Sequence, residues 1–403
     1  MTSTAKENAR SRHAPPPDTR TARLVLNAIP DVGPVSCRRL ADALGGDPVR
    51  IFHATRAQLV AVKGINETIA DTLLSWRTVF DPAVEFAKIE ERGWRFVTPE
   101  DGDGYPPLLR EIYDPPLGLY ATGEFKWGAR CVAIVGSRRI TSYGKMMART
   151  LARELAASGW CIVSGMARGV DTEAHQGALE VGGATVAVLG NGLDIVYPPE
   201  NLALYRKIAQ SGVVMSEFPL GRGADRRTFP MRNRIVTGIS RAVIVIESDI
   251  DGGSMISARF AGEQNRTVCA VPGRADSPQS KGCHALIRDG ATLVTCADEI
   301  LEELGERTKR GSAPKQQELF GEEVVGGAGG GSGGGGKAAW ESNPNVGDDE
   351  RKVLRCLTGG TALGADALAE QTGISAEVLM GKLLMMELDR LVTRTAGGAY
   401  EVA

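Results

Sequence analysis

Residues 131–171, CVAIVGSRRITSYGKMMARTLARELAASGWCIVSGMARGVD, decide the fold of this chain. The β-branched, apolar residues 131–135 predict a strand that ends at a glycine turn. Four apolar residues then recur at helical spacing before Gly159, which predicts an amphipathic helix and its end: Met146, Met147, Leu151 and Leu155. The apolar residues 161–163 predict a second strand, so this stretch is a strand-helix-strand unit.

A strand-helix-strand unit joins parallel strands with a right-handed crossover. The turn after each strand therefore lies at the same, carboxyl edge of one sheet, where open α/β sheets bind ligands and helix N-termini offer amide groups to anions. The first turn, residues 136–139, carries Arg138 and Arg139, and the second, residues 164–169 followed by Asp171, carries Arg168. We expect an anionic ligand larger than a single phosphate.

Alternating strands and helices continue beyond this unit. Strands are predicted at residues 185–189, 213–215, 242–246, 267–271 and 292–294. Helices are predicted at residues 199–210, 232–238, 254–263 and 284–288. Six or more strands in alternation with helices predict an α/β fold with a doubly wound, Rossmann-like sheet.

Composition excludes several classes of protein. The 403 residues include 47 Lys and Arg against 49 Asp and Glu, so a polyanion site has to be a local patch. The seven cysteines lie mostly in apolar runs and, like the four histidines, lack the spacing of zinc ligands. We therefore expect no metal and no cofactor. The chain has neither a signal peptide pattern nor an 18-residue apolar span, so we expect a cytoplasmic protein without a membrane partner.

Shifts in composition predict five segments. Residues 1–20 form a polar, proline-containing leader, and residues 21–80 a helical domain with two glycine turns that enter helices, at residues 29–34 and 62–66. This doubling resembles a tandem helix-hairpin-helix (SAM-like) domain. Its turns either offer amide groups to a DNA phosphate or serve packing alone. Residues 81–305 hold the sheet, with edge strands expected near residues 94–97 and 118–121.

The remaining two segments are a linker and a small domain. Residues 306–347 contain the run GGAGGGSGGGG and predict a flexible linker, and residues 348–403 predict a winged-helix domain. The second helix of that domain, residues 375–388, has only Lys382 as a base. Because a duplex reader needs more basic or amide side chains there, we favour a protein-interaction or accessory role over DNA reading.

The most distinctive composition lies in residues 221–241, GRGADRRTFPMRNRIVTGISR, where six arginines accompany the single acid Asp225. Arginines that track a backbone, with Phe229 among them to stack on a base, suit single-stranded nucleic acid. In the alternative interpretation, Arg232 and Arg234 pair with acids inside the fold and Phe229 belongs to the core.

Several motifs in the same order and spacing resemble the DprA (Smf) family of DNA-processing proteins. They are GSRRITSYG, SGMARGVDTEAHQGAL, TFPMRNRIVTGIS, DGGSMISA, and VPG followed by GCHALIRDGA. The match covers residues 80–300, and the flanking domains fit the family's layout. One departure is His284, where the family usually has asparagine.

The resemblance implies a protein that binds single-stranded DNA, protects incoming strands in natural transformation and loads the RecA recombinase on them. It also implies a homodimer through the Rossmann-like domain. Together with the turns described above, it predicts these DNA-binding residues: Gly136, Ser137, Arg138, Arg168, Arg226, Phe229, Arg232, Asn233, Arg234, Gly253 and Ser254.

An enzyme is the alternative. Residues 251–257, DGGSMIS, are similar to the PGGxGT turn of nucleotide phosphoribohydrolases, which bind a nucleoside monophosphate on a sheet of this type. Those enzymes need a glutamate three residues after the motif, where this chain has Arg259, so no general base is evident and we expect no catalytic residues. His175, four residues after Asp171, is either half of a catalytic dyad or a core histidine, and we favour the core.

Overall fold

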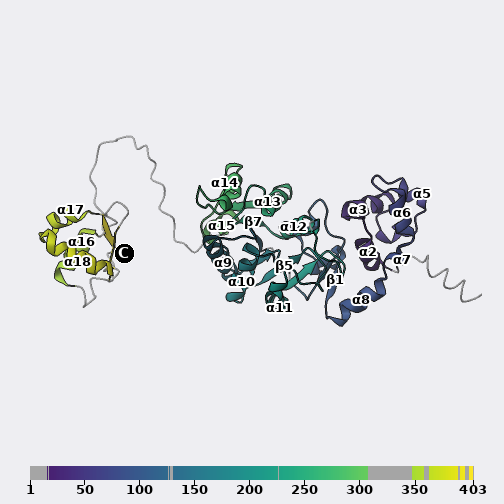
Figure 1. Cartoon of the computed structure of the whole chain (residues 1–403), viewed down its shortest axis with the longest axis horizontal. Coiled ribbons are helices and arrows are strands. Elements are labelled where there is room, and N and C mark those ends of the chain that lie inside the picture. The colour runs from purple at the N-terminus through teal and green to yellow at the C-terminus, as the bar shows by residue number, and fades with distance from the viewer. Residues whose placement is uncertain are drawn as a thin grey trace, which may run out of the picture. The chain divides into compact units, whose positions relative to one another are not determined.

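The computed structural model describes residues 16, 18–125, 127, 130–225, 227–306, 347–357, 363–388, 391–394 and 399–402. The described residues belong to two compact units, one within Met1–Pro314 and one within Lys315–Ala403 (Figure 1). The predicted leader and linker lie almost entirely outside the described residues. The first described helix begins at Thr19, two residues before the predicted domain boundary.

A sheet of nine strands forms the centre of the first unit, in the order β1-β2-β6-β5-β4-β3-β7-β8-β9. Its strands are β1 (Arg95–Val97), β2 (Leu119–Ala121), β3 (Cys131–Val135), β4 (Cys161–Ser164), β5 (Thr185–Leu189), β6 (Val213–Ser216), β7 (Ala242–Val245), β8 (Thr267–Ala270) and β9 (Thr292–Leu293). The seven strands from β3 onward pair in parallel. From β3 the chain first moves outward through β4, β5 and β6, and then returns to place β7 on the other side of β3. The point where the strand order reverses therefore lies between β3 and β7.

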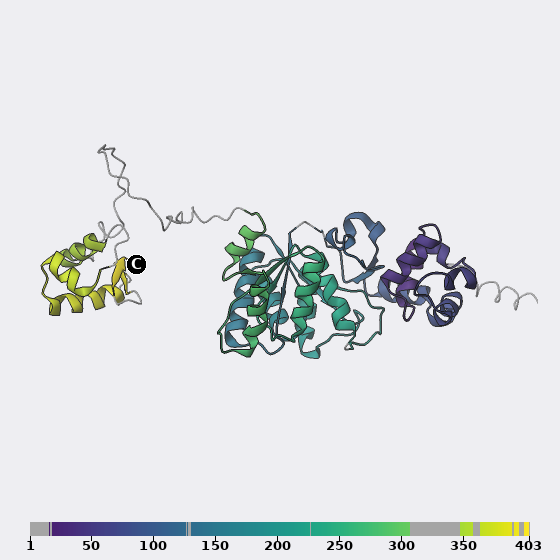
Figure 2. The same ribbon diagram turned by 90° about the horizontal axis from the view of Figure 1, so that it is seen from above.

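Two layers of helices cover the sheet, as Figure 2 shows. Alternate residues of one strand face opposite layers: Ala133 packs with α12 (Thr228–Ile239), α13 (Gly253–Glu263) and α14 (Lys281–Arg288). Val132 packs with the other layer, which contains α9 (Ser142–Ala157), α10 (Val170–Glu180) and α15 (Ala297–Glu303). Helix α11 (Leu202–Ser211), preceded by the short helix η3 (Pro199–Asn201), packs on β5 and β6. Burial on both faces explains why these strands are continuous apolar runs.

The predicted doubly wound sheet is confirmed, with differences in single elements. Helix α12 is longer than predicted, because residues before Arg232 already turn as a helix. Helix α15 follows the last strand, where the sequence interpretation placed no element. Met146, taken as part of the apolar face of α9, is 55% exposed, whereas Leu151 and Leu155 are buried.

Short helices precede the sheet. They are α2 (Thr19–Ala28), α3 (Pro34–Ala43), α4 (Pro48–Ile51), α5 (Arg56–Val60), α6 (Glu67–Leu74), α7 (Trp76–Val79) and α8 (Pro82–Glu91). As predicted, helices begin directly after both glycine turns: α3 starts at Pro34, and Asn66 caps α6 by accepting a hydrogen bond from the Ile69 amide at 2.8 Å. The Asn27 amide group donates to the Glu217 carbonyl at 2.6 Å, which ties these helices to the end of β6.

The connection between these helices and the sheet contains helices besides the two edge strands that the sequence predicts. It contains the whole of α8, which sequence analysis missed, and the short helices η1 (Pro99–Gly104) and η2 (Leu108–Arg110). Both predicted edge strands are present: β1 pairs antiparallel with β2, and β2 pairs antiparallel with β6.

The second unit contains α16 (Asp348–Leu357), α17 (Ala365–Thr372), α18 (Ala376–Leu388) and the antiparallel strands β10 (Val392–Arg394) and β11 (Tyr400–Val402). Three helices followed by a hairpin are the winged-helix arrangement that the sequence predicts. Its core includes Leu354, Leu368 and Leu383. No helix among the described residues is long and apolar enough to cross a bilayer.

Candidate functional site

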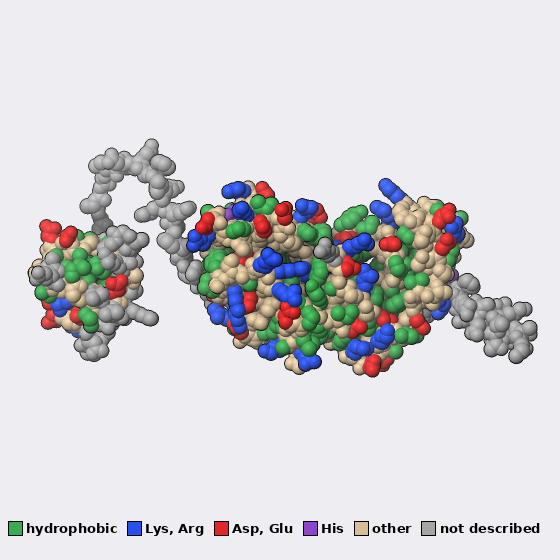
Figure 3. All heavy atoms as spheres, viewed as in Figure 1, with side chains coloured by type: hydrophobic (Ala, Val, Ile, Leu, Met, Phe, Trp, Pro, Cys, Tyr) green, Lys and Arg blue, Asp and Glu red, His purple; other side chains and the backbone are tan. Residues whose placement is uncertain are grey.

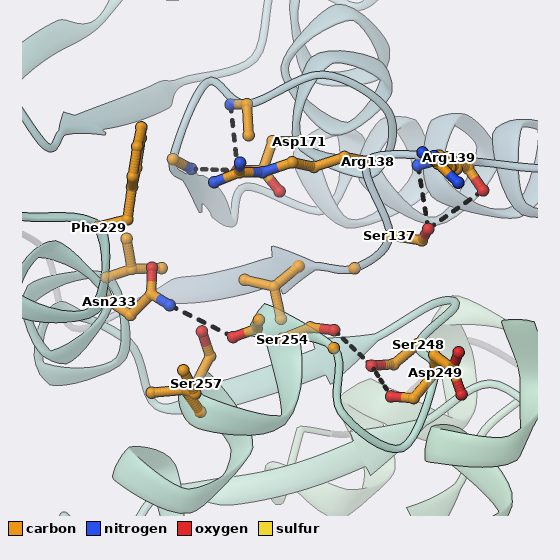
Figure 4. Close-up of a pocket in the computed structure, with 18 of the residues that line it drawn as sticks. Ser137, Arg138, Arg139, Asp171, Phe229, Asn233, Ser248, Asp249, Ser254 and Ser257 are labelled. Carbon is orange, nitrogen blue, oxygen red and sulfur yellow. Dashed lines mark hydrogen bonds between the residues drawn. The ribbon is translucent and has the colours of Figure 1, made fainter. Parts of the chain in front are cut away.

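A pocket of about 680 Å³ opens at the point where the strand order of the sheet reverses. It lies at the carboxyl ends of the strands, between the turns that follow β3, β4 and β7 and the first half of α12 (Figure 4). Open α/β sheets bind their ligands at this position, because the two crossovers leave a crevice there. The turns that the sequence singled out, after β3 and β4, therefore do meet at one site.

Backbone hydrogen bonds join the three turns to one another. The Ser137 amide donates to the Glu247 carbonyl at 2.7 Å, and the Val170 amide donates to the Ser137 carbonyl at 3.2 Å. The buried Glu247 carboxylate accepts from the Thr141 amide at 2.9 Å, which anchors the start of α9. The turn after β3 is thus held from both sides, and its Arg138 and Arg139 side chains extend from a rigid support.

The turn after β4 closes around Asp171. Its carboxylate accepts hydrogen bonds from the amides of Gly165 at 3.1 Å and Ala167 at 3.2 Å. A Cβ atom on Gly165 would lie 1.7 Å from the Arg232 guanidinium, so this position has to be glycine. Gly169 has a φ of +80° and lies against the Ser137 carbonyl, where a side chain would both be strained and collide.

Arg232 is a buried part of the pocket wall, with 4% of its surface exposed. Its guanidinium donates to the carbonyls of Gly165 and of Val188, the latter at 2.7 Å, and its Nε donates to Asn233 Oδ1 at 3.1 Å. Burial lowers the pKa of Arg232 and raises that of Asp171, and the opposite charge of each partner opposes both shifts. Arg232 therefore gives the pocket a positive wall that the fold itself holds in place.

Arg138 and Phe229 stand together at the pocket (Figure 4). The exposed Arg138 side chain extends toward Phe229, and its guanidinium carbon lies 4.7 Å from the centre of the ring. The Tyr197 ring lies nearby, with its centre 5.7 Å from that of Phe229. Phe229 is only half-buried, so it forms part of the pocket surface as well as packing.

The N-terminus of α13 supplies the opposite wall. Gly253 is exposed there, and an added Cβ would meet no atom within 4 Å. The buried Ser254 hydroxyl donates to Ser248 Oγ at 2.7 Å, which ties α13 to the turn after β7. Asn233 reaches across from α12 and donates to the Gly253 carbonyl at 3.4 Å. The amide groups of this helix start face the same pocket as the arginines, an arrangement suited to anions.

Arg168 lies at a smaller hollow beside the main pocket. It shares this hollow with Arg138, Tyr197 and Phe229. Its guanidinium forms an ion pair with Glu200, and both side chains are about half exposed. The positive charge of Arg168 is thus partly matched before any ligand binds.

The arginine-rich stretch does not form one surface patch. On the face of the first unit that Figure 3 draws, Lys and Arg side chains lie in several separate groups. Arg234 is buried in an ion pair with Glu217, and its Nη1 donates to the Asp114 carbonyl at 2.6 Å. Arg222 pairs with Asp225 at 2.9 Å, and Arg241 lies over the Trp160 ring. Arg234 therefore does not line the pocket, as the alternative interpretation of this residue anticipated. Arg226 lies outside the described residues.

The structure brings the other predicted residues to the pocket or to the hollow beside it. They are Gly136, Ser137, Arg138, Arg168, Phe229, Arg232, Asn233, Gly253 and Ser254. Sequence reasoning missed Ser248, Asp249 and Ser257 as lining residues, and Tyr197 at the hollow. The first two belong to the turn that follows β7, so a correct strand order would have pointed to them.

His175 belongs to the core of the fold. It is fully buried on α10, and its Nδ1 lies 2.7 Å from Thr185 Oγ1. That hydroxyl gives its own proton to the Ile162 carbonyl, so Nδ1 is the donor of the pair. Burial lowers the pKa of His175 to about 3. In the described part of the chain, no hydrogen bond joins it to Asp171, and no group of three His, Cys, Asp or Glu side chains could hold a metal ion.

Comparisons with known proteins agree on one family. The family model described as DNA recombination-mediator protein A matches residues 95–305, and the model described as DprA winged helix domain matches residues 337–398. The chain is 36% identical to "Protein Smf" of Synechocystis sp. over 311 residues, which are 75% of this chain and 77% of that protein. It is 43% identical to "Protein Smf" of Escherichia coli over 274 residues, or 66% of this chain and 72% of that one.

One solved structure extends this agreement to the fold. The X-ray structure of DNA processing protein A (DprA) from Streptococcus pneumoniae superposes with a TM-score of 0.60 at 31% identity. The superposition covers 71% of this chain and 98% of that one.

Proposed function

The chain belongs to the DprA (Smf) family of DNA recombination mediators, and from this premise we propose that it binds single-stranded DNA in the pocket between β3 and β7. The observation that carries the proposal is the pairing of charge and stacking surface there. Arg138 lies over the half-buried Phe229, beside the positive wall of Arg232 and the free amides of α13. A phosphate and a neighbouring base need these two kinds of group side by side.

The proposed interface differs from the set of DNA-binding residues that the sequence predicts. It consists of the turn after β3, Arg168, Phe229, Arg232, Asn233 and the start of α13. Arg139 joins it, because its side chain is exposed beside Arg138 and takes part in no ion pair between described residues. Arg234 is left out, since its guanidinium is used inside the fold.

The finer parts of the function extend the family's role to this chain. In this proposal the protein protects incoming strands, loads the RecA recombinase on them, acts in the cytoplasm and dimerises through the Rossmann-like sheet. Protection needs no chemistry at the site, and we assign it no catalytic residue. Support for these steps comes from membership of a recombination-mediator family.

The alternative, an enzyme acting on a nucleoside monophosphate, uses the same anion site. A pocket of about 680 Å³ is large enough for a mononucleotide. The acids at the site argue against it. Asp171 is buried and already accepts two amide hydrogen bonds, and Arg259 occupies the place of the missing glutamate. The other acid that lines the pocket, Asp249, lies outside the motif position and accepts a hydrogen bond from the Ile250 amide.

A competition titration separates the two. A fluorescently labelled oligothymidine is titrated with the protein at two salt concentrations, in the presence and absence of an excess of nucleoside monophosphates. We expect tight binding that weakens with salt, by about −0.7 in the log-log slope for each phosphate contact, and little displacement by mononucleotides. Mononucleotide binding with release of a free base, and no binding of the oligonucleotide, would refute the proposal.

A further inference from the structure

We infer that Tyr113 and Arg38 form a second contact for the same single strand, outside the pocket, where a base stacks on the open face of the tyrosine ring. This inference rests on the proposed function. It adds a binding site outside the pocket, between α3 and the segment that follows η2.

Tyr113 is the most exposed of the large apolar side chains in the described structure, with 70% of its surface accessible. The Arg38 guanidinium lies 4.8 Å from the centre of its ring. One face of the ring thus carries a cation, which leaves the other for a planar group. An exposed aromatic ring beside a free arginine is the unit with which proteins hold unpaired bases.

The backbone on both sides of Tyr113 is rigid. Ile112 is 5% exposed and belongs to the sheet core, and the Asp114 carbonyl accepts a hydrogen bond from the buried Arg234. In a flexible loop, a tyrosine could turn inward and bury its ring. The backbone at Tyr113 is fixed on both sides, so the ring stays exposed to solvent. A structural explanation of the ring as a core residue therefore fails.

Positive charge accompanies the ring. Arg38 and Arg39 are neighbours on α3, and the Arg39 Nη1 donates to the Lys63 carbonyl at 3.4 Å, which brings the second glycine turn alongside. All three side chains are exposed, and no ion pair between described residues includes any of them. Arg38 lies against the open aromatic ring, and Arg39 and Lys63 add positive charge to the same group of helices. Such a combination favours a polyanion that also has planar groups.

Helix α12 connects this surface with the pocket. Phe229, Arg232 and Asn233 of this helix line the pocket. The next residue, Arg234, anchors Asp114, and Gly238 packs against Ile112. At 1.5 Å per residue, the helix spans about 8 Å between Asn233 and Gly238. A strand that leaves the pocket along α12 would therefore run toward the segment that carries Tyr113.

The test compares two lengths of labelled oligothymidine by fluorescence anisotropy, one of about 5 and one of about 20 nucleotides, which bracket common site sizes. The variants are Tyr113→Ala, Tyr113→Phe and Arg38→Ala. Arg92→Ala serves as the matched control, because Arg92 also lies near an aromatic ring of the N-terminal region, at 5.6 Å from Trp94. Thermal unfolding of each variant is recorded alongside.

We expect Tyr113→Ala to bind the long oligonucleotide at least about fivefold more weakly and the short one unchanged, as loss of one stacked base predicts. Tyr113→Phe keeps wild-type affinity, since phenylalanine also stacks. Arg38→Ala reduces the salt slope for the long oligonucleotide by about 0.7, and Arg92→Ala changes neither affinity nor slope.

Either of two results would overturn this inference and leave the proposed function intact. One is wild-type affinity of both Tyr113→Ala and Arg38→Ala for the long oligonucleotide. The other is equal weakening for both lengths together with a lower unfolding temperature, which would make the pair a staple between α3 and the sheet. If the wild-type protein bound neither length, the proposed function would fail, and this inference with it.

Discussion

Arg138 and Arg234 carry the same guanidinium group, but their surroundings give them different roles. Arg138 is exposed and stacks on Phe229, whereas only 4% of the Arg234 side chain is accessible, against Glu217. An exposed arginine can exchange water for a phosphate at little cost, while a buried one already neutralises a buried acid. The difference is measurable, because salt affects a phosphate contact and leaves a buried pair almost untouched.

The first prediction therefore concerns Arg138→Ala. We expect this variant to reduce the salt slope of oligothymidine binding by about 0.7, because one phosphate contact is lost, with unfolding unchanged. Salt titrations of binding and urea unfolding measure the two quantities.

Arg234→Ala is the matched comparison. It leaves Glu217 buried without its partner, and we expect it to lower the free energy of unfolding by about 3 to 5 kcal/mol. Weaker binding by Arg138→Ala at an unchanged salt slope would contradict a phosphate contact.

A second residue-scale prediction concerns His175 and pH. Its pKa is about 3 in the folded protein, against an ordinary value near 6.5 in the unfolded chain. Below pH 6.5 the unfolded state binds a proton that the folded state does not, so this residue makes stability fall as pH falls from 6.5 toward 3. At pH 5 the loss is about 2 kcal/mol.

Urea unfolding of the wild type and of His175→Gln at pH 7 and pH 5 checks this value. The variant is needed because burial raises the pKa of Asp171 and Glu217, and those two groups act in the opposite sense. The stability of the wild type should fall by more than that of the variant between the two pH values. Equal changes would show that folding does not lower the pKa of His175.

At the scale of an element, a negative charge at the N-terminus of α13 should have opposite effects on the stability of the helix and on the affinity for DNA. The helix begins at Gly253 without a side-chain cap, and its first amides face the pocket. An acidic side chain at a helix start stabilises the helix by about 0.3 to 1 kcal/mol, but the same negative charge repels a phosphate.

Gly253→Asp is the variant that exploits this. Space is available for the new side chain, since no atom lies within 4 Å of the added Cβ. We expect an unchanged or higher unfolding temperature and an affinity for oligothymidine roughly tenfold lower, or 1.4 kcal/mol.

Gly253→Ala is the control for this variant, because it fills the same position without charge and should bind nearly as the wild type does. Unchanged affinity of Gly253→Asp would remove the start of α13 from the interface. A loss of stability in both variants would point to packing.

At the scale of the whole molecule, the two compact units differ in the chemistry that they offer to DNA. The unit with the sheet carries the pocket, whereas in the winged-helix unit the only base of α18, Lys382, lies 3.5 Å from the Asp349 carboxylate. Met380 and Met385 on the same helix are about half exposed. This composition favours an accessory or protein-binding role of the winged helix.

The last prediction is that truncation after Glu306 leaves a folded protein with nearly intact affinity for single strands. The removed residues contain the glycine-rich run and the winged helix, neither of which supplies a residue of the proposed interface. Gel shifts and strand-exchange assays of both forms at the same salt concentration measure the effect. A loss beyond about tenfold, or 1.4 kcal/mol, would place the winged helix in the DNA site.

Local patterns in the chain were enough to predict the class of the fold and the turns that line the pocket. The apolar runs of β3, β5 and β7 are local patterns, and a strand buried on both faces leaves such a run wherever it lies in the sheet. The glycine turn at residues 136–139 could be assigned to the ligand edge because parallel strands all end at one edge of the sheet.

Which residues share the pocket, and which arginines are exposed rather than paired with an acid, follows from tertiary contacts. Strand order depends on crossovers between distant segments, so the turn after β7, with Ser248 and Asp249, was not recognised as the partner of the turn after β3. The role of an arginine depends on whether an acid packs against it. Arg234 pairs with Glu217, which follows the end of β6, and the sequence around Arg234 gives no sign of that contact. The sequence shows which side chains are charged. The residues that folding places next to a charged side chain determine whether it contacts water, a carboxylate or a ligand.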